Sequence, residues 1–460
     1  MTETDERTAQ DTRTLLVHLG TAMVATGQPI NEVEDELAEV ALALGHPGAQ
    51  IAASPTGVTL SLASGAPATY EAVTGALRLD QAAQVRGIRR DLLRGQVEGP
   101  AALSSLLALR SQPPRYPVWL ANLGWVATAT GIALILQPGW RNVALSAVAS
   151  VVVVALFRLA QRFRLLATLL PVVAAFVVAC LVFAAADLGL VDGPLRTLLP
   201  PLAVLLPGAL IVTAMSELAA GDMIAGSARL TFGLVQVLLF TLGVVSASRM
   251  FALPPDALEN VRVAELGWWA APVGLVLICV GIGLLESPPV RLLPWILLVL
   301  VLAFGAQALG QHSSGPVLGS FLGAVAASVG SYLVEAFVPD LPRLVVFLPS
   351  FWLLVPGSLG VLSATELALD PGGATATVVG VMAIVSALAL GLLVGTAIAQ
   401  SGRGAVRRAR HRGRHHQLPL VIASPWSSGT STPANGRLRR PPGPISRGNL
   451  PVVETQARSG

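Results

Sequence analysis

Residues 200–219 read PPLAVLLPGALIVTAMSELA, and residues 349–368 read PSFWLLVPGSLGVLSATELA. Nine of the twenty positions are identical without a gap, at a constant offset of 149 residues. Leu and Ala recur by chance in any apolar sequence, but the joint recurrence of Pro-Gly and Glu-Leu-Ala at one offset indicates an internal duplication. Pro-Gly breaks at corresponding places in two apolar halves are typical of binding sites in secondary transporters.

The composition predicts a polytopic membrane protein. The chain has 460 residues, of which 53% are hydrophobic and 12% are charged, and its mean hydropathy is +0.69. All 30 basic residues are arginine, so the lysine of a phosphate-binding loop and a lysine Schiff base are both excluded. Cys180 and Cys279 fall in apolar runs, and no HExxH or CxxC pattern occurs. We therefore expect no metal, no cofactor, no disulfide and no nucleic-acid partner.

Residues 1–115 lack apolar runs long enough to cross a membrane and are expected to form a small soluble α+β domain in the cytosol. Their polar start carries no apolar signal-peptide core. Asn31 has the spacing of a helix N-cap with Glu34 in a capping box, and Ser54-Pro55-Thr56-Gly57 predicts a turn between two short strands. Helices are expected over 11–26, 33–44, 77–94 and 101–110, and strands over 49–53 and 57–63.

Ten apolar runs follow, each long enough to cross the hydrocarbon core as a helix. They lie near 118–136, 142–160, 165–186, 196–219, 228–248, 268–285, 292–309, 316–338, 343–368 and 374–399. Adding 149 to the starts of the first five gives nearly the starts of the last five. The predicted fold is therefore mainly α, with ten transmembrane helices as two inverted five-helix repeats, over 116–250 and 251–400.

Arginines indicate the orientation. Arg158, Arg162 and Arg164 cluster after the second run, whereas the 310–316 and 369–373 loops have none. With the basic run 403–416, this pattern favours an inner (cytoplasmic) membrane protein with both termini in the cytoplasm. Residues 401–460 are rich in Arg, Pro, Gly and Ser and are expected to form a disordered basic tail.

Pro207-Gly208 and Pro356-Gly357 are the candidate substrate-binding residues. Proline removes a backbone donor, and glycine lets the chain bend and a ligand approach the backbone. The half-helix that starts after each pair presents unpaired N–H groups and a positive dipole end, which suit a carboxylate. The alternative interpretation is a pair of ordinary proline kinks.

Glu217 and Glu366, ten residues beyond the prolines, are the candidate coupling or gating residues. Placing a carboxylate in or near a membrane span costs free energy, so such a residue indicates a functional site. The alternative is a carboxylate at the headgroup level. Asp187, Asp222 and Glu335 are expected to face headgroups, His312 to be a solvated loop residue, and the small residues Gly319, Gly323, Ala327 and Ser331 to pack helices closely. The acids Glu32, Glu34, Glu36 and Glu39 are expected on a solvated helix face.

Three segments of the N-terminal region carry a resemblance to a known family: GQPINEVEDELAEVALALG (27–45), IAASPTGVTLSL (51–62) and LLALRSQPPRYPVW (106–119). Together with the two Pro-Gly segments they resemble the threonine/serine exporter family, in a form with both halves fused in one chain. The resemblance covers the chain to about residue 400.

The resemblance implies export of L-threonine and L-serine across the cytoplasmic membrane, driven by the proton motive force, with no enzymatic activity. The partners would be a small amino acid, protons and the lipid bilayer, and a homo-oligomer is compatible with this interpretation. Two alternatives stay open: an exporter of another small carboxylate such as a dicarboxylate, and a membrane-anchored hydrolase acting through residues 1–115.

Overall fold

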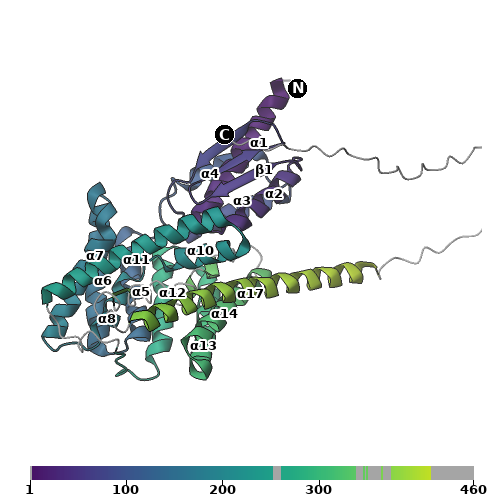
Figure 1. Cartoon of the computed structure of the whole chain (residues 1–460). Coiled ribbons are helices and arrows are strands. Elements are labelled where there is room, and N and C mark those ends of the chain that lie inside the picture. Colours follow the sequence, from purple (N-terminus) through teal and green to yellow (C-terminus); the bar gives the residue numbers. More distant parts are fainter. Residues whose placement is uncertain are drawn as a thin grey trace, which may run out of the picture. The chain divides into compact units, whose positions relative to one another are not determined.

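The computed structural model describes residues 3–251, 261–337, 345–347, 349–350, 364–365 and 374–415 (Figure 1). The chain begins with α1 (Glu3–Ala25) and α2 (Ile30–Ala43), followed by the strands β1 (Gln50–Ser54), β2 (Gly57–Ser61) and β3 (Ala68–Ala72). Two helices follow the strands, α3 (Leu79–Leu93) and α4 (Gly99–Leu109). α2, α3 and α4 lie within a few residues of their predicted ranges, whereas α1 begins at Glu3, eight residues before its predicted start.

The strands form one antiparallel sheet in the order β1-β2-β3. Pro55 and Thr56 connect β1 to β2, and the backbone N–H of Gly57 donates to Ser54 Oγ (3.1 Å). The central strand buries Val58 and Leu60 in a core shared with α1 and α2. The sequence predicts the β1–β2 hairpin but not β3, whose residues Ala68, Tyr70 and Ala72 are exposed and which has no fully buried residue.

The predicted cap of α2 is wrong. The helix begins at Ile30 with Pro29 in the N-cap position, and no side chain caps it. Glu34 instead accepts a hydrogen bond from the backbone N–H of Ala53 (2.8 Å), which ties α2 to β1. Glu36 and Glu39 both form ion pairs with Arg89 of α3. These acids therefore connect elements, and α2 does not simply present them to solvent.

The described residues contain seven helices that are long and apolar enough to cross a membrane. They are α5 (Val118–Leu136), α6 (Trp140–Ala160), α7 (Arg164–Asp187), α11 (Met223–Phe251), α13 (Leu293–Ser314, preceded by the 3-10 turn Val290–Leu292), α14 (Pro316–Phe337) and the stretch Val379–Ala399 of α17 (Ala374–His415). The predicted sixth span is the shorter α12 (Ala270–Leu285), and most of the ninth lies outside the described residues.

The predicted fourth span is broken into three pieces. α8 (Pro194–Thr197) and α9 (Leu199–Leu202) are single turns, and α10 (Gly208–Ala220) starts only after a non-helical stretch. Pro200 and Pro201 lie in the first turn of α9, and because they lack the N–H groups that would bond to α8, the two turns do not join into one longer helix. The tail 401–460 is described only as far as residue 415, where it continues α17 as a helix, so that part of it differs from the expected disorder.

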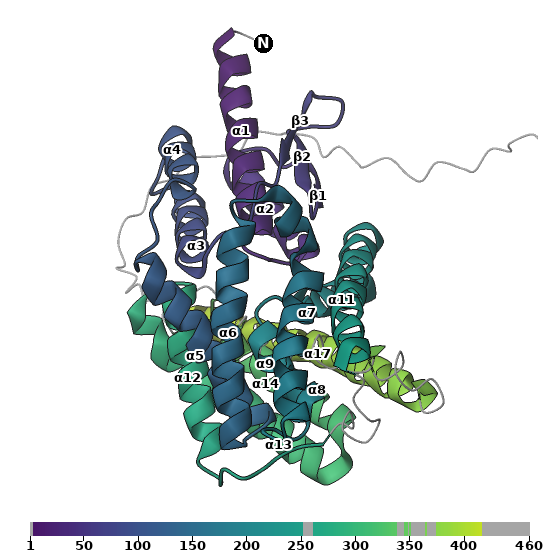
Figure 2. The ribbon, with the colours of Figure 1, turned by 90° about the vertical axis from the view of Figure 1, so that its left-hand side faces the viewer.

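Reciprocal glycine contacts join α5 and α12, which lie side by side (Figure 2). A Cβ added to Gly131 would lie 2.6 Å from the carbonyl oxygen of Gly274, and one added to Gly274 would lie 2.7 Å from that of Gly131. Gly124 and Gly281 form the same mutual contact at 2.6 Å in both directions. The two backbones therefore approach to a distance that only glycine allows.

A second close contact occurs twice along the chain. A Cβ added to Gly243 of α11 would lie 2.5 Å from the carbonyl oxygen of Val172 in α7. A Cβ added to Gly391 of α17 would lie 2.5 Å from the carbonyl oxygen of Phe321 in α14. Val172 and Phe321 are separated by 149 residues, the offset of the duplicated Pro-Gly segments.

Candidate functional site

The first Pro-Gly pair lies at the start of a half-helix. Pro207 occupies the N-cap position of α10 and Gly208 is the first helical residue. The preceding residues are held by short-range bonds, from Leu205 N–H to the Leu202 oxygen (2.8 Å) and from Leu206 N–H to the Ala203 oxygen (3.3 Å). The first-turn N–H groups of α10 have no acceptor within the helix, so this end carries partial positive charge.

The start of α10 packs against helices from the second half of the chain. Val212, which is fully buried, shares a core with Ala303 of α13, Ala324 and Ala327 of α14, and Leu388 of α17. Next to Ala327, Ser328 is 1% exposed, and its Oγ has no hydrogen-bond partner among the described residues. A buried half-helix start beside a second-half helix with an unsatisfied hydroxyl is suited to hold a small polar ligand.

The second copy of this motif cannot be compared in the same way. Pro356, Gly357 and Glu366 lie outside the described residues. Of the repeated segment, the described residues are 349–350 and 364–365, and Thr365 is 1% exposed with an unpartnered Oγ1.

Glu217 is fully buried on α10, near the turn into α11. Its Oε1 accepts from Arg229 Nη1 of α11 (2.7 Å) and from the backbone N–H of Ile30, the first residue of α2 (3.0 Å). Gly221 makes the turn possible because its φ of +94° suits glycine. One carboxylate therefore joins two membrane helices to the N-terminus of a helix from the first 115 residues.

Two further carboxylates belong to this region: Asp222 lies near Glu217, and Glu34 lies near Asp222. Asp222 caps the start of α11 through its Oδ1, which accepts from the N–H of Ala225 (3.4 Å). The pKa of Glu34 is raised mainly by burial and further by the negative charge of Asp222, although the bond from Ala53 N–H opposes the shift. Glu217 Oε2 and Asp222 Oδ2 are both buried without a hydrogen-bond partner among the described residues. Both oxygens therefore keep unused hydrogen-bonding capacity among the described residues.

Arg229 and the contact of Glu217 with Ile30 were not predicted from the sequence. Arg229 falls at the start of the predicted 228–248 run, where an arginine in apolar sequence is itself a signal of function. The contact with Ile30 leaves no such signal, because it uses a backbone N–H that is 187 residues away along the chain.

The other candidates have simpler surroundings. Glu335 does not face headgroups as expected, because it forms an ion pair with Arg86 of α3 and its side chain is 8% exposed. Asp187 and His312 are exposed. The small residues of α14 pack closely: a Cβ on Gly319 would lie 2.7 Å from the Gln307 oxygen of α13. Among the described residues, no group of three or more His, Cys, Asp or Glu side chains could hold a metal ion.

A second carboxylate also lies near a helix N-terminus from the first 115 residues. Glu286 follows α12 directly, and the backbone N–H of Leu79, the first residue of α3, interacts favourably with its charge. Burial raises the pKa of Glu286 to about 7, the interaction with Leu79 lowers it, and the charge of Asp80 raises it. Leu79 and Ala82 belong to the same apolar core as α12 and α13. The N-terminal elements are thus attached to both halves of the chain.

Several apolar spans, a broken helix and buried charged groups define a multi-pass membrane protein. The chain belongs to the family described as "putative threonine/serine exporter", whose profile matches residues 14–251, slightly more than half of its length. An uncharacterised protein of Schizosaccharomyces pombe is 20% identical over 314 residues, which is 65% of this chain and 37% of that protein. The chain thus spans little more than a third of that relative. No solved structure matches.

Proposed function

We propose that the chain is a secondary exporter of L-threonine and L-serine in the cytoplasmic membrane, driven by the proton motive force. The observation that carries the proposal is family membership across α1–α11, the region that contains both the Pro207-Gly208 break and Glu217. Families of this kind are transporters, and the site has the parts that transport needs: a half-helix start for a carboxylate and a buried acid for a proton.

The proposed architecture is two inverted five-helix repeats fused in one chain, 116–250 and 251–400. The α7–α11 contact recurs as the α14–α17 contact, at an offset of 149 residues from Val172 to Phe321 and of 148 residues from Gly243 to Gly391, which supports a duplication. The mutual contact of α5 with α12 is also what equivalent helices make across a two-fold axis, because each then contacts the other through the same residues. On this proposal both termini lie in the cytoplasm.

The substrate carboxylate is proposed to bind the N–H groups at Gly208, and at Gly357 in the second repeat. Backbone groups recognise a carboxylate without regard to the side chain, so selection of threonine and serine needs hydroxyl partners. Ser328 and Thr365 supply buried hydroxyls with unused hydrogen-bonding capacity among the described residues. A glycine at the half-helix start leaves room for the substrate beside the backbone.

Proton coupling is proposed to act through Glu217. In the described state its charge is balanced by Arg229, and its second oxygen is free of partners among the described residues. Protonation would weaken the attraction to Arg229 and to the N–H of Ile30 together. Both α10–α11 packing and the attachment of α2 would then loosen, which links a proton to a change of conformation.

Efflux from proteoliposomes tests the proposal. Vesicles preloaded with labelled threonine, serine, alanine or a dicarboxylate are placed in an imposed pH gradient. We expect efflux of threonine and serine only, at a rate that collapses when an uncoupler removes the gradient. Dicarboxylate efflux alone would contradict the substrate assignment. Ester or amide hydrolysis by the same preparation, abolished by one substitution within residues 1–115, would favour an enzyme.

A further inference from the structure

A basic cavity lies between α3 and the second half of the chain. Its volume is about 570 Å³, and five arginines line it: Arg86, Arg89 and Arg90 of α3, Arg115 before α5, and Arg291 before α13. Only two acidic residues, Asp80 and Glu335, contribute to the lining. Because the walls carry more positive than negative charge, the cavity favours an anion.

The acids of the cavity already have arginine partners. Asp80 is paired with Arg78, and Glu335 with Arg86. Arg115 lies over the ring of Tyr116 at 6.0 Å, and neither Arg115 nor Arg291 forms an ion pair among the described residues. Both are exposed and come from segments that directly precede a membrane span. Two guanidinium groups are thus left to meet a ligand.

Gly87 of α3 is one of the residues that line the cavity. This residue lies in the middle of α3, where glycine is less favourable than alanine because it costs more chain entropy. No atom lies within 4 Å of a Cβ added at Gly87, and its φ is not positive, so the protein alone gives no reason for glycine there. An occupant of the cavity would give one.

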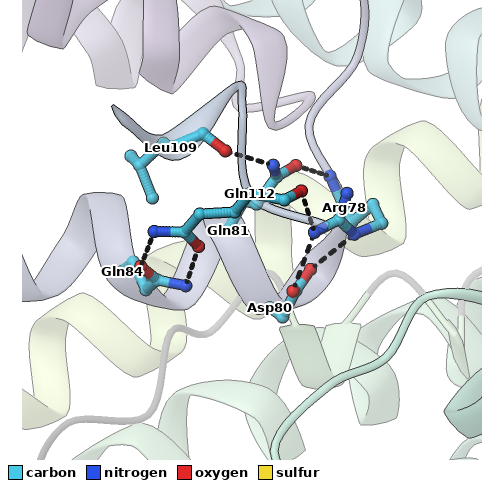
Figure 3. Close-up of polar contacts among 6 residues, drawn as sticks. All are labelled: Arg78, Asp80, Gln81, Gln84, Leu109 and Gln112. Carbon is cyan, nitrogen blue, oxygen red and sulfur yellow. Dashed lines mark hydrogen bonds and ion pairs between the residues drawn. The ribbon is translucent and has the colours of Figure 1, made fainter. Parts of the chain in front are cut away.

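The wall formed by α3 is held in place before any ligand binds (Figure 3). Gln81 accepts from the backbone N–H of Arg78 (3.0 Å) and donates to the Leu109 oxygen (2.7 Å). The side chains of Gln84 and Gln112 bond each other in both directions, at 2.9 and 3.1 Å. These bonds fix the start of α3 against the end of α4. A rigid wall lowers the entropy cost of binding.

We propose that this cavity binds a phosphate-bearing anion, held chiefly by Arg115 and Arg291, that joins α3 to the second half of the chain. Guanidinium groups bind phosphate oxygens in pairs and stay charged at any physiological pH. Because both arginines directly precede membrane spans, the phosphate of an anionic lipid headgroup can reach them, as can a soluble phosphate ester.

Thermal unfolding of the purified full-length protein tests this inference. The midpoint is measured in nanodiscs of phosphatidylcholine, in nanodiscs containing phosphatidylglycerol, and in phosphatidylcholine with added glycerol 3-phosphate. The variants are Arg115→Gln with Arg291→Gln, which removes charge, and Gly87→Leu, which fills the cavity and keeps the charge. Arg164→Gln, an exposed arginine at the start of α7, is the matched control, and Gly87→Ala tests the fold of α3.

A rise in the midpoint with phosphatidylglycerol identifies a lipid headgroup, and a rise with glycerol 3-phosphate identifies a soluble ester. We expect affinity to fall about fivefold for each arginine removed, and to fall for Gly87→Leu, but not for Arg164→Gln. The inference is overturned if neither anion raises the midpoint, or if the rise survives both the double arginine variant and Gly87→Leu. Export plays no part in this readout, so the result is independent of the transport proposal.

Discussion

Replacing Glu217 by glutamine changes the charge of a buried site and little else. The amide oxygen of Gln can still accept the N–H of Ile30, so the main loss is the 2.7 Å ion pair with Arg229. The Arg229 side chain is 8% exposed, so its charge would be left without compensation. Neutralising one member of a buried pair costs about 3–5 kcal/mol. We expect the thermal midpoint to fall by roughly 5 °C or more.

A double-mutant cycle measures the coupling free energy between Glu217 and Arg229. Arg229→Gln leaves Glu217 buried and unpaired, so its cost should be of similar size. The double variant should cost less than the sum, because neither charge is then left alone. Additive costs within about 0.5 kcal/mol would refute the idea that the two groups act as a pair.

Transport in the same variants tests the coupling role. If Glu217 carries the proton, Glu217→Gln and the double variant both lose efflux driven by a pH gradient. Threonine exchange across the membrane, which needs no net proton movement, should persist in the double variant because its fold is restored. Gradient-driven efflux at the unmutated rate in the double variant would leave Glu217 with a structural role only.

Three further outcomes are expected. Gly208→Leu should insert normally and abolish export, whereas Gly305→Leu on α13, where an added Cβ meets no atom within 4 Å, should export normally; equal export by both would contradict a site at the half-helix start. In intact cells, a membrane-impermeant thiol reagent should label the variant His312→Cys and should not label Arg162→Cys. The reverse labelling pattern would show that the topology is inverted. Burial raises the folded-state pKa of Glu286 to about 7 from its ordinary value of 4.5, so stability should be highest below pH 4.5 and should fall by at most about 3 kcal/mol as the pH rises from 4.5 to 7. Glu286→Gln should flatten the dependence of the thermal midpoint on pH across this range.

The local sequence was sufficient to predict the first three membrane helices and the interruption of the fourth apolar run. The first three apolar runs become α5, α6 and α7 with ends within a few residues, because twenty apolar residues in lipid must satisfy their own backbone and can do so only as a helix. Pro207-Gly208 interrupts the chain because proline lacks the N–H that the helix needs. The Ser54–Gly57 turn follows in the same way from the conformations that its residues favour.

The hydrogen-bond and ion-pair partners that lie far apart in the sequence could not be predicted from local sequence. Glu34 has the spacing of a capping box, yet it accepts a partly buried hydrogen bond from the N–H of Ala53 in β1, because α2 packs beside that strand. Glu335 has the position of a headgroup residue, yet it pairs with Arg86 because α3 packs against the second half. In both cases the residue type and position are local properties, and the partner comes from packing.

The amino-acid sequence predicted the duplication, the membrane class, the helix break and a carboxylate in apolar sequence at Glu217, because each prediction depends on residues within one segment or on a fixed offset. Only the tertiary structure placed the backbone N–H of Ile30 on Glu217 and Leu79 near Glu286, and gathered five arginines around one cavity. A backbone N–H is the same in every residue except proline, so its choice of partner leaves no mark in the sequence.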